Sequence, residues 1–408
     1  MTWYRNKTLG SALLVGGTAI GAGMLALPLT TGIGGFLYSF ELFVIVFAFM
    51  LLTLFYLLEA TLMTHRSNAN LISICKELLG PIGEFTAWVS FLLLLYSVAA
   101  AYLLGGGSLV AEMLGATFHL FVSTESGMFL FLFIFGFIVI FETRAIDVMN
   151  RICMIGLLFF FGLLLFFVTP HVEMHHYEKG EVKFLWAVIP VVVLSFTSHI
   201  IVPSLTRYLN RDIGKLKRTL IWGSLIPFVF YLVWEFLIIG VLPLSGPYGL
   251  KSIGGSSHPI AELTEALNVI LGAPWIAIIV SLFSFFALIT SFFGVALSLY
   301  DFLADGLCIK KTIKGKLLLL FLMFTPPLLF ALFYPKGFVK ALGYAGVFVA
   351  ILYVALPTLM VWRGRYVDKR HTKFRVFGGK PLLFVMFIGF LLIVFLQIAA
   401  TGGWLPVL

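Results

Sequence analysis

Long apolar runs fill most of this sequence and leave little of it for anything else. Their approximate limits are 9–31, 36–62, 84–112, 126–142, 152–169, 184–206, 219–243, 273–303, 316–334, 338–362 and 381–401. About 20 apolar residues in a helix cross the hydrocarbon core of a bilayer. Only 11% of the residues are charged, against roughly 25% in an ordinary soluble domain. The runs are continuous rather than alternating, which excludes a β-barrel. The sequence therefore predicts an all-α integral membrane protein with about 11 transmembrane helices, forming one domain over residues 1–408.

The lysines and arginines predict how the chain is oriented. If the N-terminus is placed inside and the helices alternate, most of the 27 Lys and Arg residues fall in inside segments. The five that fall outside are Lys179, Lys183, Lys251, Lys336 and Lys340. Positively charged loops stay in the cytoplasm, so we expect a cytoplasmic N-terminus and a C-terminus on the opposite side. This distribution also explains the net charge of +9. No basic stripe alternates with aromatic residues, so nucleic acid is not an expected partner.

Two outside connections are long enough to carry structure of their own. Residues 170–183 contain His171, His175 and His176. A metal site is one interpretation, but no further ligands converge on these histidines in the sequence, so a solvated loop is the favoured prediction. Residues 244–272 contain the amphipathic stretch HPIAELTEALNVI, which predicts a short surface helix that covers an outer vestibule.

The three cysteines, Cys75, Cys153 and Cys308, are widely spaced along the chain. An odd number without short spacings argues against a disulfide framework or a zinc site. All three fall near helix ends that are predicted to face the cytosol. We therefore expect free thiols, and no metal or other cofactor.

The first apolar run is rich in glycine. Its sequence GGTAIGAGMLALP covers residues 16–28 and contains four glycines and a proline. Glycine holds a helix poorly, and unpaired backbone in lipid costs several kcal/mol per group. An unwound stretch is therefore tolerated only where it lines a cavity or binds a ligand. Close helix packing through small residues is the alternative, and unwinding is the favoured prediction.

The sixth run has a matching polar interruption. The sequence SFTSHI covers residues 195–200, between Pro190 and Pro203. A polar cluster in the middle of a membrane indicates a functional site. Ser and Thr can instead bond back to their own helix, but that alternative does not account for His199.

The two interrupted runs lie five helices apart, which predicts an inverted repeat. Interrupted helices at corresponding positions of two halves are typical of secondary transporters. The first repeat would cover residues 7–169, the second residues 184–362, and a further helix residues 381–401. The N-terminal ends of the half-helices would direct their positive dipole ends at an anionic group such as a carboxylate.

Four ordered motifs carry a resemblance to a known family. They are NKTLGSALLVGGTAIGAGMLALPL at 6–29, SFTSHIIVPS at 195–204, ALITSFFGVALSLYDFLAD at 287–305 and PPLLFALFYPKGFVKALGYAGV at 326–347. Along its whole length the chain resembles the bacterial aromatic amino acid permeases, and most of all their tyrosine-specific branch. The resemblance implies a leucine-transporter-like fold in the inner membrane and import of an aromatic amino acid, usually by proton symport. Ser198 and Ile200 depart from the family, which commonly has an aromatic residue and a glycine there.

The resemblance also implies where substrate binds. Backbone amides around Gly21, Ala22 and Gly23 would bind the substrate carboxylate, and the hydroxyl of Thr18 or Ser195, with nearby carbonyls, would bind the ammonium group. An apolar slot with one or two polar groups would take the aromatic side chain. The candidates for this slot are Tyr96, Phe196, Ser198, His199 and Phe285.

Two kinds of coupling ion remain open. By resemblance to sodium-coupled relatives, five neutral oxygens would hold Na⁺: the carbonyls of Gly17, Ile20 and Ala287 and the hydroxyls of Thr290 and Ser291. The alternative is that the two hydroxyls only bond to local backbone. A proton needs a titratable group, and among the acidic residues Glu41 and Glu235 lie deepest in the predicted helices; His199 is a further candidate.

Other classes of function find no support in the sequence. There is no nucleophile–base motif, no HExxH motif and no Walker A motif, so an enzyme and an ATP-driven pump are not expected. A channel would not need paired interrupted helices, and a receptor would normally carry a soluble signalling domain. Within transport, a serine/threonine permease or a tryptophan-specific permease is the alternative to tyrosine. The expected partners are the aromatic substrate and the lipid bilayer, with no obligatory protein partner.

Overall fold

The chain folds into a bundle of helices. The computed structural model describes residues 7–64, 70–118, 122–136, 138–139, 143–178, 180–310 and 312–406. Within these ranges the regular structure is helical and no strand occurs. Nine helices of the described ranges are long and apolar enough to cross a membrane. The predicted class, an all-α integral membrane protein, is confirmed.

The uninterrupted helices form the frame of the bundle. They are α3 (Phe36–Met63), α5 (Pro81–Phe118), α7 (Thr143–Val168), α10 (Ile213–Val241), α13 (Pro274–Gly306), α14 (Ile313–Phe333) and α17 (Gly379–Thr401). A further span runs through α15 (Phe338–Val349), a π-helical stretch η8 (Ala350–Ala355) and α16 (Leu356–Tyr366). The shorter helices are α4 (Leu71–Leu79), α6 (Thr124–Phe131), η3 (Leu132–Gly136), η4 (Thr169–His171), η5 (Met174–Glu178), η6 (Val182–Phe184), α11 (Leu250–Gly254) and α12 (Pro259–Leu271).

The first span is broken, as its glycines predict. Helix α1 (Lys7–Ala19) ends before Ile20, and α2 (Ala22–Thr30) begins after Gly21. The two halves, Lys7–Ala19 and Gly23–Gly34, meet at 55°. The second half ends in the short 3-10 turn η2 (Gly32–Gly34). Counting this bent pair as one span brings the number in the described ranges to ten.

The sixth span is broken as well. Helix α8 (Leu185–Ser195) ends at Ser195, and Phe196, Thr197 and Ser198 lie outside any helix. The chain then resumes through η7 (His199–Ile201) and α9 (Val202–Tyr208), with Pro203 in the first turn of α9. Proline is favoured there because the first turn does not need its N–H.

Two further expectations concern the remaining elements. The run at 126–142 corresponds to a shorter apolar helix, Thr124–Gly136, and part of that run, including residues 140–142, lies outside the described residues. Lys179, one of the five basic residues predicted to lie outside, is also not among the described residues. The amphipathic stretch after residue 257 is the predicted short helix, α12, and it buries Ile260, Leu263 and Leu267.

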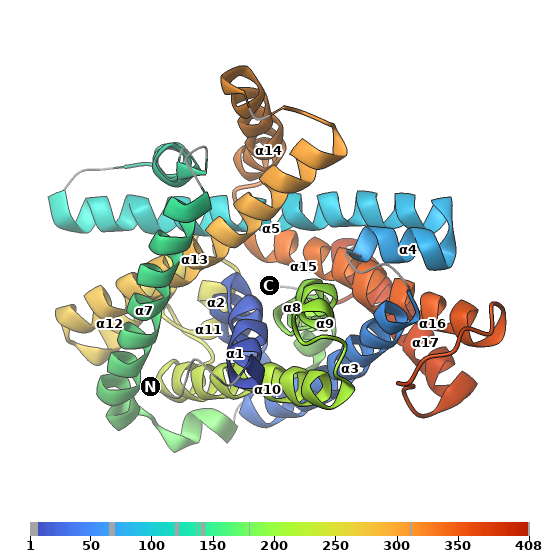
Figure 1. The fold of residues 1–408 in the computed structure, drawn as a ribbon. Helices are drawn as coiled ribbons and strands as arrows, with labels where there is room; N and C mark the ends of the chain where they lie inside the picture. The colour runs from blue at the N-terminus through green and yellow to red at the C-terminus, as the bar shows by residue number, and fades with distance from the viewer. Residues whose placement is uncertain are drawn as a thin grey trace.

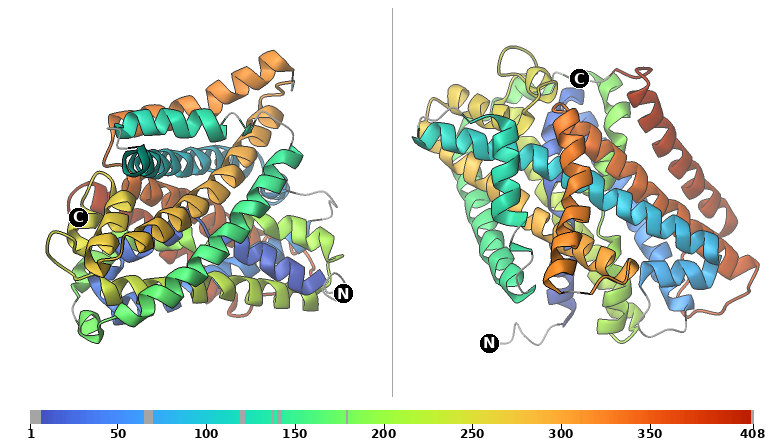
Figure 2. Two further views of the ribbon diagram at one scale, coloured as in Figure 1. Left: turned by 90° about the vertical axis from the view of Figure 1, so that its left-hand side faces the viewer. Right: turned by 90° about the horizontal axis from the view of Figure 1, so that it is seen from above.

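The broken spans lie at the centre of the bundle. Figure 1 shows α1, α2, α8 and α9 in the middle of the bundle, with α3, α5, α10 and α13 around them. Helix α2 packs against α8, and α1 packs against α10. Helices α14 and α17 lie at the edge. The right-hand view of Figure 2 places the two ends of the chain at opposite ends of the bundle.

A buried ion pair ties the C-terminal part of the bundle together. Arg365 of α16 donates from Nε to Glu59 Oε1 at 2.6 Å and from Nη2 to Glu59 Oε2 at 2.5 Å. The backbone N–H of Val376 also donates to Glu59 Oε2, at 2.7 Å, and the carbonyl of Val376 accepts from Arg365. The two charged side chains are 2% and 0% exposed. The pair therefore joins α3, α16 and the connection that leads to α17.

Removing one member of this pair should destabilise the protein strongly. Arg365→Met leaves the carboxylate of Glu59 buried without a counter-charge, which costs about 3–5 kcal/mol. Thermal unfolding of the detergent-purified protein measures the loss. The double variant Glu59→Leu/Arg365→Met should recover much of it, because no charge then remains buried. Lys76→Gln is the control, since it breaks the exposed pair of Lys76 with Glu84 and should cost about 1 kcal/mol or less. Equal effects of R365M and K76Q would contradict the prediction.

Candidate binding cavity at the two helix breaks

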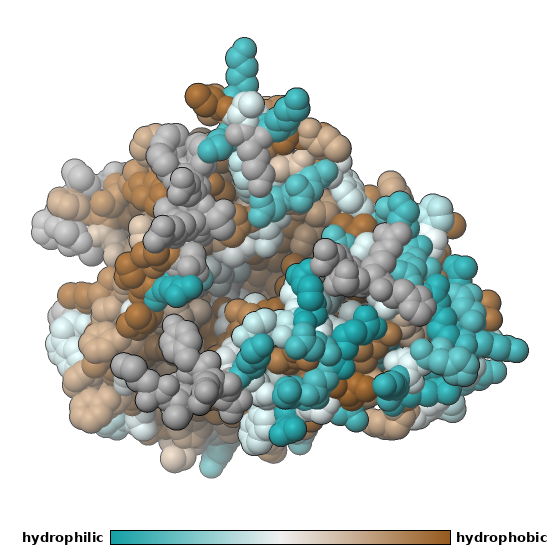
Figure 3. Space-filling view, in the orientation of Figure 1, coloured by the Kyte–Doolittle hydropathy of each residue, from teal (hydrophilic) through white to brown (hydrophobic). Residues whose placement is uncertain are grey.

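A cavity of about 310 Å³ lies where the two broken spans meet. Its size is at the lower end of the range of about 300–1,000 Å³ that is typical of small-molecule sites. Helices α5, α7, α13 and α15 complete its walls. In Figure 3, hydrophilic side chains gather on the right-hand side and at the top of the face shown, beside a hollow in its middle, whereas the left-hand side is mostly hydrophobic. The lining residues are Gly17, Thr18, Ala19, Ile20, Gly21, Gly23, Phe91, Leu94, Leu95, Val98, Tyr102, Asn150, Met154, Leu194, Ser195, Thr197, Ile200, Thr290, Ser291, Gly294, Val295, Ser298, Leu342, Val349 and Tyr353.

The first break presents backbone donors to this cavity. Gly21 precedes α2, and the N–H of Met24 bonds to its carbonyl. The first N–H groups of a helix have no partner within the helix, and together with the helix dipole they favour an anion. Gly21 and Gly23 line the cavity beside them. The side chain of Ala22 lies outside the described part of the structure.

Two glycines at the first break lie very close to side chains of neighbouring helices. A Cβ on Gly23 would clash with Oγ of Ser195 and would come within 3.2 Å of its Cα. A Cβ on Gly21 would lie 2.7 Å from Oγ of Ser291 and 3.3 Å from the hydroxyl of Tyr102. Glycine is therefore needed here for close approach as well as for unwinding, and the two alternatives raised by the sequence both hold.

One tyrosine joins the two breaks. The hydroxyl of Tyr231 on α10 lies 2.6 Å from the carbonyl of Ala19 and 2.9 Å from the carbonyl of Ser195. These are the last residues of α1 and α8, whose carbonyls have no partner further along their own helices. Tyr231 is fully buried. Its single hydroxyl is thus within hydrogen-bonding distance of one helix-terminal carbonyl in each broken span.

Most hydroxyls of the cavity bond back to their own helices. Thr18 donates to the carbonyl of Val15 at 2.7 Å, and Ser195 donates to that of Val191 at 2.9 Å. Thr197, two residues after the end of α8, donates to the carbonyl of Val193 at 3.0 Å. Because each hydroxyl has a single hydrogen, its oxygen is left as an acceptor for another donor.

Some of the oxygens expected to hold Na⁺ lie close to one another. Ser291 Oγ is 3.5 Å from the carbonyl oxygen of Ile20, across the gap between α13 and the first break. Thr290 Oγ1 lies 3.1 Å from the carbonyl oxygen of Ala287 and 2.9 Å from that of Phe286. Gly17, Ile20, Thr290 and Ser291 line the cavity, whereas Ala287 is buried behind them.

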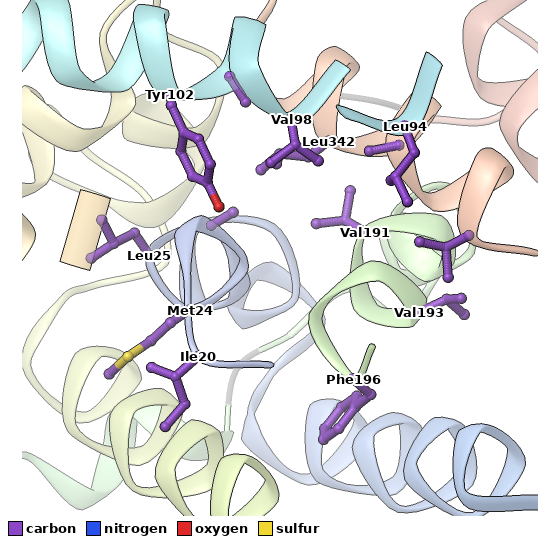
Figure 4. Packing of buried hydrophobic residues seen from close by; sticks show 14 of the residues in the cluster. Ile20, Met24, Leu25, Leu94, Val98, Tyr102, Val191, Val193, Phe196 and Leu342 are labelled. Carbon is purple, nitrogen blue, oxygen red and sulfur yellow. The ribbon is translucent and has the colours of Figure 1, made fainter. Parts of the chain in front are cut away.

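Three aromatic residues proposed for the side-chain slot lie outside the cavity lining. The hydroxyl of Tyr96 donates to the carbonyl of Leu322 on α14 at 2.8 Å. The ring of Phe285 packs edge-on against Phe135. Phe196 points away from the cavity towards α3, as Figure 4 shows, and meets Phe43 there. None of the three side chains belongs to the lining, and the contacts with substrate expected of them stay predictions.

Ser198 and His199 are also absent from the lining. Ser198 is 2% exposed and His199 is fully buried. Nε2 of His199 lies 2.8 Å from Oγ1 of Thr53, and the ring stacks on Tyr353, with 4.9 Å between the centroids. The histidine therefore packs behind Tyr353, which lines the cavity, and its expected part in the slot stays a prediction.

The structure adds residues that sequence reasoning missed. Tyr102 of α5 directs its hydroxyl towards the first broken span in Figure 4. Asn150 of α7 has a buried Oδ1 with no hydrogen-bond partner among the described residues. Tyr353 also lines the cavity, as does Ile200, which the sequence had singled out for its departure from the family. A polar side chain in the apolar span 152–169 would have drawn attention, but Asn150 precedes that expected span by two residues.

The two carboxylic acids proposed for proton coupling have different surroundings. Glu41 is exposed near the start of α3 and does not line the cavity, and its role in coupling stays a prediction. Glu235 of α10 is fully buried. Its Oε1 accepts from the hydroxyl of Thr31 at 2.6 Å, and its Oε2 has no partner among the described residues. Glu235 lies outside the lining as well, and its hydrogen bond connects it to Thr31 at the end of α2.

Two broken membrane spans around a central cavity define a membrane transporter. The chain belongs to the tryptophan/tyrosine permease family, whose pattern matches residues 4–397. It is 33% identical over 406 residues to "Tyrosine-specific transport system 2" of Haemophilus influenzae, covering 99% of each chain. It is 35% identical over 408 residues to "Tyrosine-specific transport system 1" of the same organism, covering 98% of this chain and 99% of the relative. The chain is therefore an aromatic amino acid permease and not an enzyme.

A solved structure has the same fold. The manganese transporter of Eremococcus coleocola, in complex with an aromatic bis-isothiourea substituted compound, matches with a TM-score of 0.62 and 14% identity. The match covers 97% of this chain and 86% of that chain. The fold is thus leucine-transporter-like, as expected.

Proposed function

We propose that this permease imports tyrosine by symport with H⁺ across the bacterial inner membrane. The observation that carries the proposal is the cavity at the two helix breaks. It has backbone donors at Gly21 and Gly23, and at Asn150 a side-chain acceptor that has no partner within the described segments. Two relatives with tyrosine-specific names, at 33% and 35% identity, support the choice of substrate. Tryptophan-specific transport and serine or threonine transport are the competing assignments, and parallel uptake assays with each amino acid separate them.

The amino acid end of the substrate would lie at the first break. The free N–H groups before and within the first turn of α2 would bind its carboxylate, aided by the helix dipole. Thr18 and Ser195 already donate to their own helices, so their oxygens are acceptors. This suits an ammonium group, which only donates.

The aromatic ring would lie among the apolar lining residues. Leu95 and Val98 of α5 and Leu342 and Val349 of α15 provide apolar surface. Asn150 Oδ1 would accept the hydrogen of the phenol. A buried acceptor without a partner is costly, so tyrosine would be preferred over an analogue that lacks the hydroxyl.

Asn150→Leu should therefore change which substrate is preferred. We expect the uptake efficiency (kcat/KM) for tyrosine to fall about tenfold or more, since an unmade buried hydrogen bond costs about 1–3 kcal/mol. Uptake of phenylalanine should not fall. Proteoliposome uptake of both radiolabelled amino acids measures the ratio. Met154→Leu, one turn further along α7 and also in the lining, is the control and should leave the ratio unchanged. A ratio that stays the same in N150L would contradict the role of Asn150.

The coupling ion in this proposal is H⁺, carried by Glu235. No ion pair with Glu235 occurs in the part of the chain that the structure describes, and burying a carboxylate without a partner is expensive. Release of its proton would therefore need a change in its surroundings, which is what coupling requires. Na⁺ is the second candidate, and the facing oxygens of Ser291 and Ile20 favour it.

Two variants should separate the ions. In proteoliposomes, an imposed proton gradient without Na⁺ should drive accumulation of tyrosine by the wild type. Glu235→Gln should abolish this accumulation but keep exchange of labelled for unlabelled tyrosine, because the amide retains a bond to Thr31 and cannot release a proton. Ser291→Ala should keep proton-driven accumulation. Accumulation that requires Na⁺ and is lost in S291A would instead assign coupling to Na⁺, and absence of tyrosine uptake under either gradient would refute the substrate.

The orientation and the repeats are also part of the proposal. The N-terminus would be cytoplasmic and the C-terminus periplasmic, as the lysines and arginines indicate. Residues 7–169 and 184–362 would form the two inverted repeats, with residues 381–401 as an added helix. Support comes from the position of the breaks, one in the first span of each proposed repeat.

Native cysteines should report the orientation. Cys308 is exposed, whereas Cys75 and Cys153 are buried. Burial raises the pKa of the Cys75 thiol to about 12, so it stays protonated and unreactive at neutral pH. A membrane-impermeant maleimide should therefore label Cys308 in inside-out vesicles and not in intact cells. Cys308→Ser removes the label, and Ser252→Cys in that background places an exposed thiol on the proposed outer side. The reverse pattern would refute the orientation.

A further inference from the structure

Three side chains converge in the connection after α7. Glu173, His175 and His176 each offer one ligand atom, and these atoms all lie within 4.8 Å of one another. Oε2 of Glu173 is 3.3 Å from Nδ1 of His175 and 4.0 Å from Nε2 of His176. Zinc ligands lie about 2.0–2.2 Å from the metal, so tetrahedral ligand atoms are about 3.3 Å apart. Small rotations of the exposed Glu173 and His175 side chains would close the remaining difference.

The tautomer and orientation of the His176 ring suit coordination of a metal ion. Its Nδ1 lies 3.0 Å from the carbonyl oxygen of Gly240 at the end of α10. A carbonyl only accepts, so Nδ1 carries the hydrogen and Nε2 keeps its lone pair free. Metal-binding histidines almost always donate their other N–H to such a partner, which fixes the tautomer and the ring.

The backbone of the cluster is fixed as well. The N–H of Glu173 donates to the same Gly240 carbonyl at 2.8 Å. The hydroxyl of Tyr177 donates to the carbonyl of Phe236 at 2.9 Å, and its ring stacks on that of Phe236. The short helix η5 is therefore held on α10 by contacts that do not need a metal. A preformed site loses less entropy when it binds its ion.

We propose that Glu173, His175 and His176 form a binding site for a divalent metal ion of the zinc class, with water in the fourth position. Two imidazoles and one carboxylate suit Zn²⁺ and its neighbours Ni²⁺ and Cu²⁺, whereas Mg²⁺ and Ca²⁺ require oxygen ligands. The favoured expectation of a plain solvated loop missed Glu173 as a ligand. It also missed the contact with Gly240, which lies 64 residues further along the chain.

Direct titration tests the site without any transport assay. Tag-free purified protein is titrated with Zn²⁺ in competition with a chromophoric chelator. We expect one site that Mg²⁺ and Ca²⁺ at equal concentration do not occupy. Glu173→Gln, His175→Ala and His176→Ala should each weaken binding at least tenfold, since even loss of an outer-shell partner costs 10–100-fold.

His171→Ala is the matched control. His171 lies in the same connection, is exposed, and has its Nδ1 on the carbonyl of Phe167. This variant should bind Zn²⁺ as the wild type does. The proposal is overturned if the triple variant of Glu173, His175 and His176 binds Zn²⁺ as tightly as the wild type. It is equally overturned if H171A weakens binding as much as H176A, or if Ca²⁺ displaces Zn²⁺. Thermal unfolding without metal verifies that each variant is folded, and the exposed positions of Glu173 and His175 favour that.

Discussion

The central cavity depends on a single hydroxyl that satisfies two broken helices. In a bilayer, every exposed backbone carbonyl needs a donor, because lipid supplies none. The hydroxyl of Tyr231 lies within hydrogen-bonding distance of Ala19 and Ser195, the last residues of α1 and α8. One hydrogen cannot bond fully to both carbonyls, so the tyrosine shares it or alternates. Either arrangement lets both helices end beside the same hydroxyl, and it leaves the remaining lone pairs of these carbonyls available at the breaks.

Glycine in the first span has two physical roles that the sequence presents as alternatives. The chain unwinds at Ile20 and Gly21, where the next helix begins at 55° to the first. Gly23 is already helical, and there a side chain would collide with Ser195. Unwinding exposes backbone donors, and close packing brings the second break up to them. Neither role alone would make a cavity with polar groups from both spans.

Local sequence patterns predicted the fold well. Contacts between residues far apart in the sequence determine which side chains line the cavity. Spans and breaks follow from runs of apolar residues, glycines and prolines, which act within one helix. Which residues face the cavity depends on the rotation of each helix and on its neighbours. Tyr96 and Tyr102 lie on the same helix, yet Tyr96 bonds to α14 and Tyr102 lines the cavity. His199 seemed too polar for the helix interior. Thr53, 146 residues away, gives its Nε2 a partner, whereas its Nδ1 has none among the described residues.

The link between Glu235 and the cavity would run through α2, the second half of the first span. Thr31 follows the end of α2, and its hydroxyl lies 2.7 Å from the carbonyl of Leu27 and 2.6 Å from Glu235. Since the hydroxyl has one hydrogen, a charged carboxylate would draw it away from Leu27 more strongly than a neutral acid. The last turn of α2 would then lose a bond while its first turn still holds Gly23 against Ser195. A proton at Glu235 would thus act on α2, the short helix whose first N–H groups are proposed to bind the substrate carboxylate.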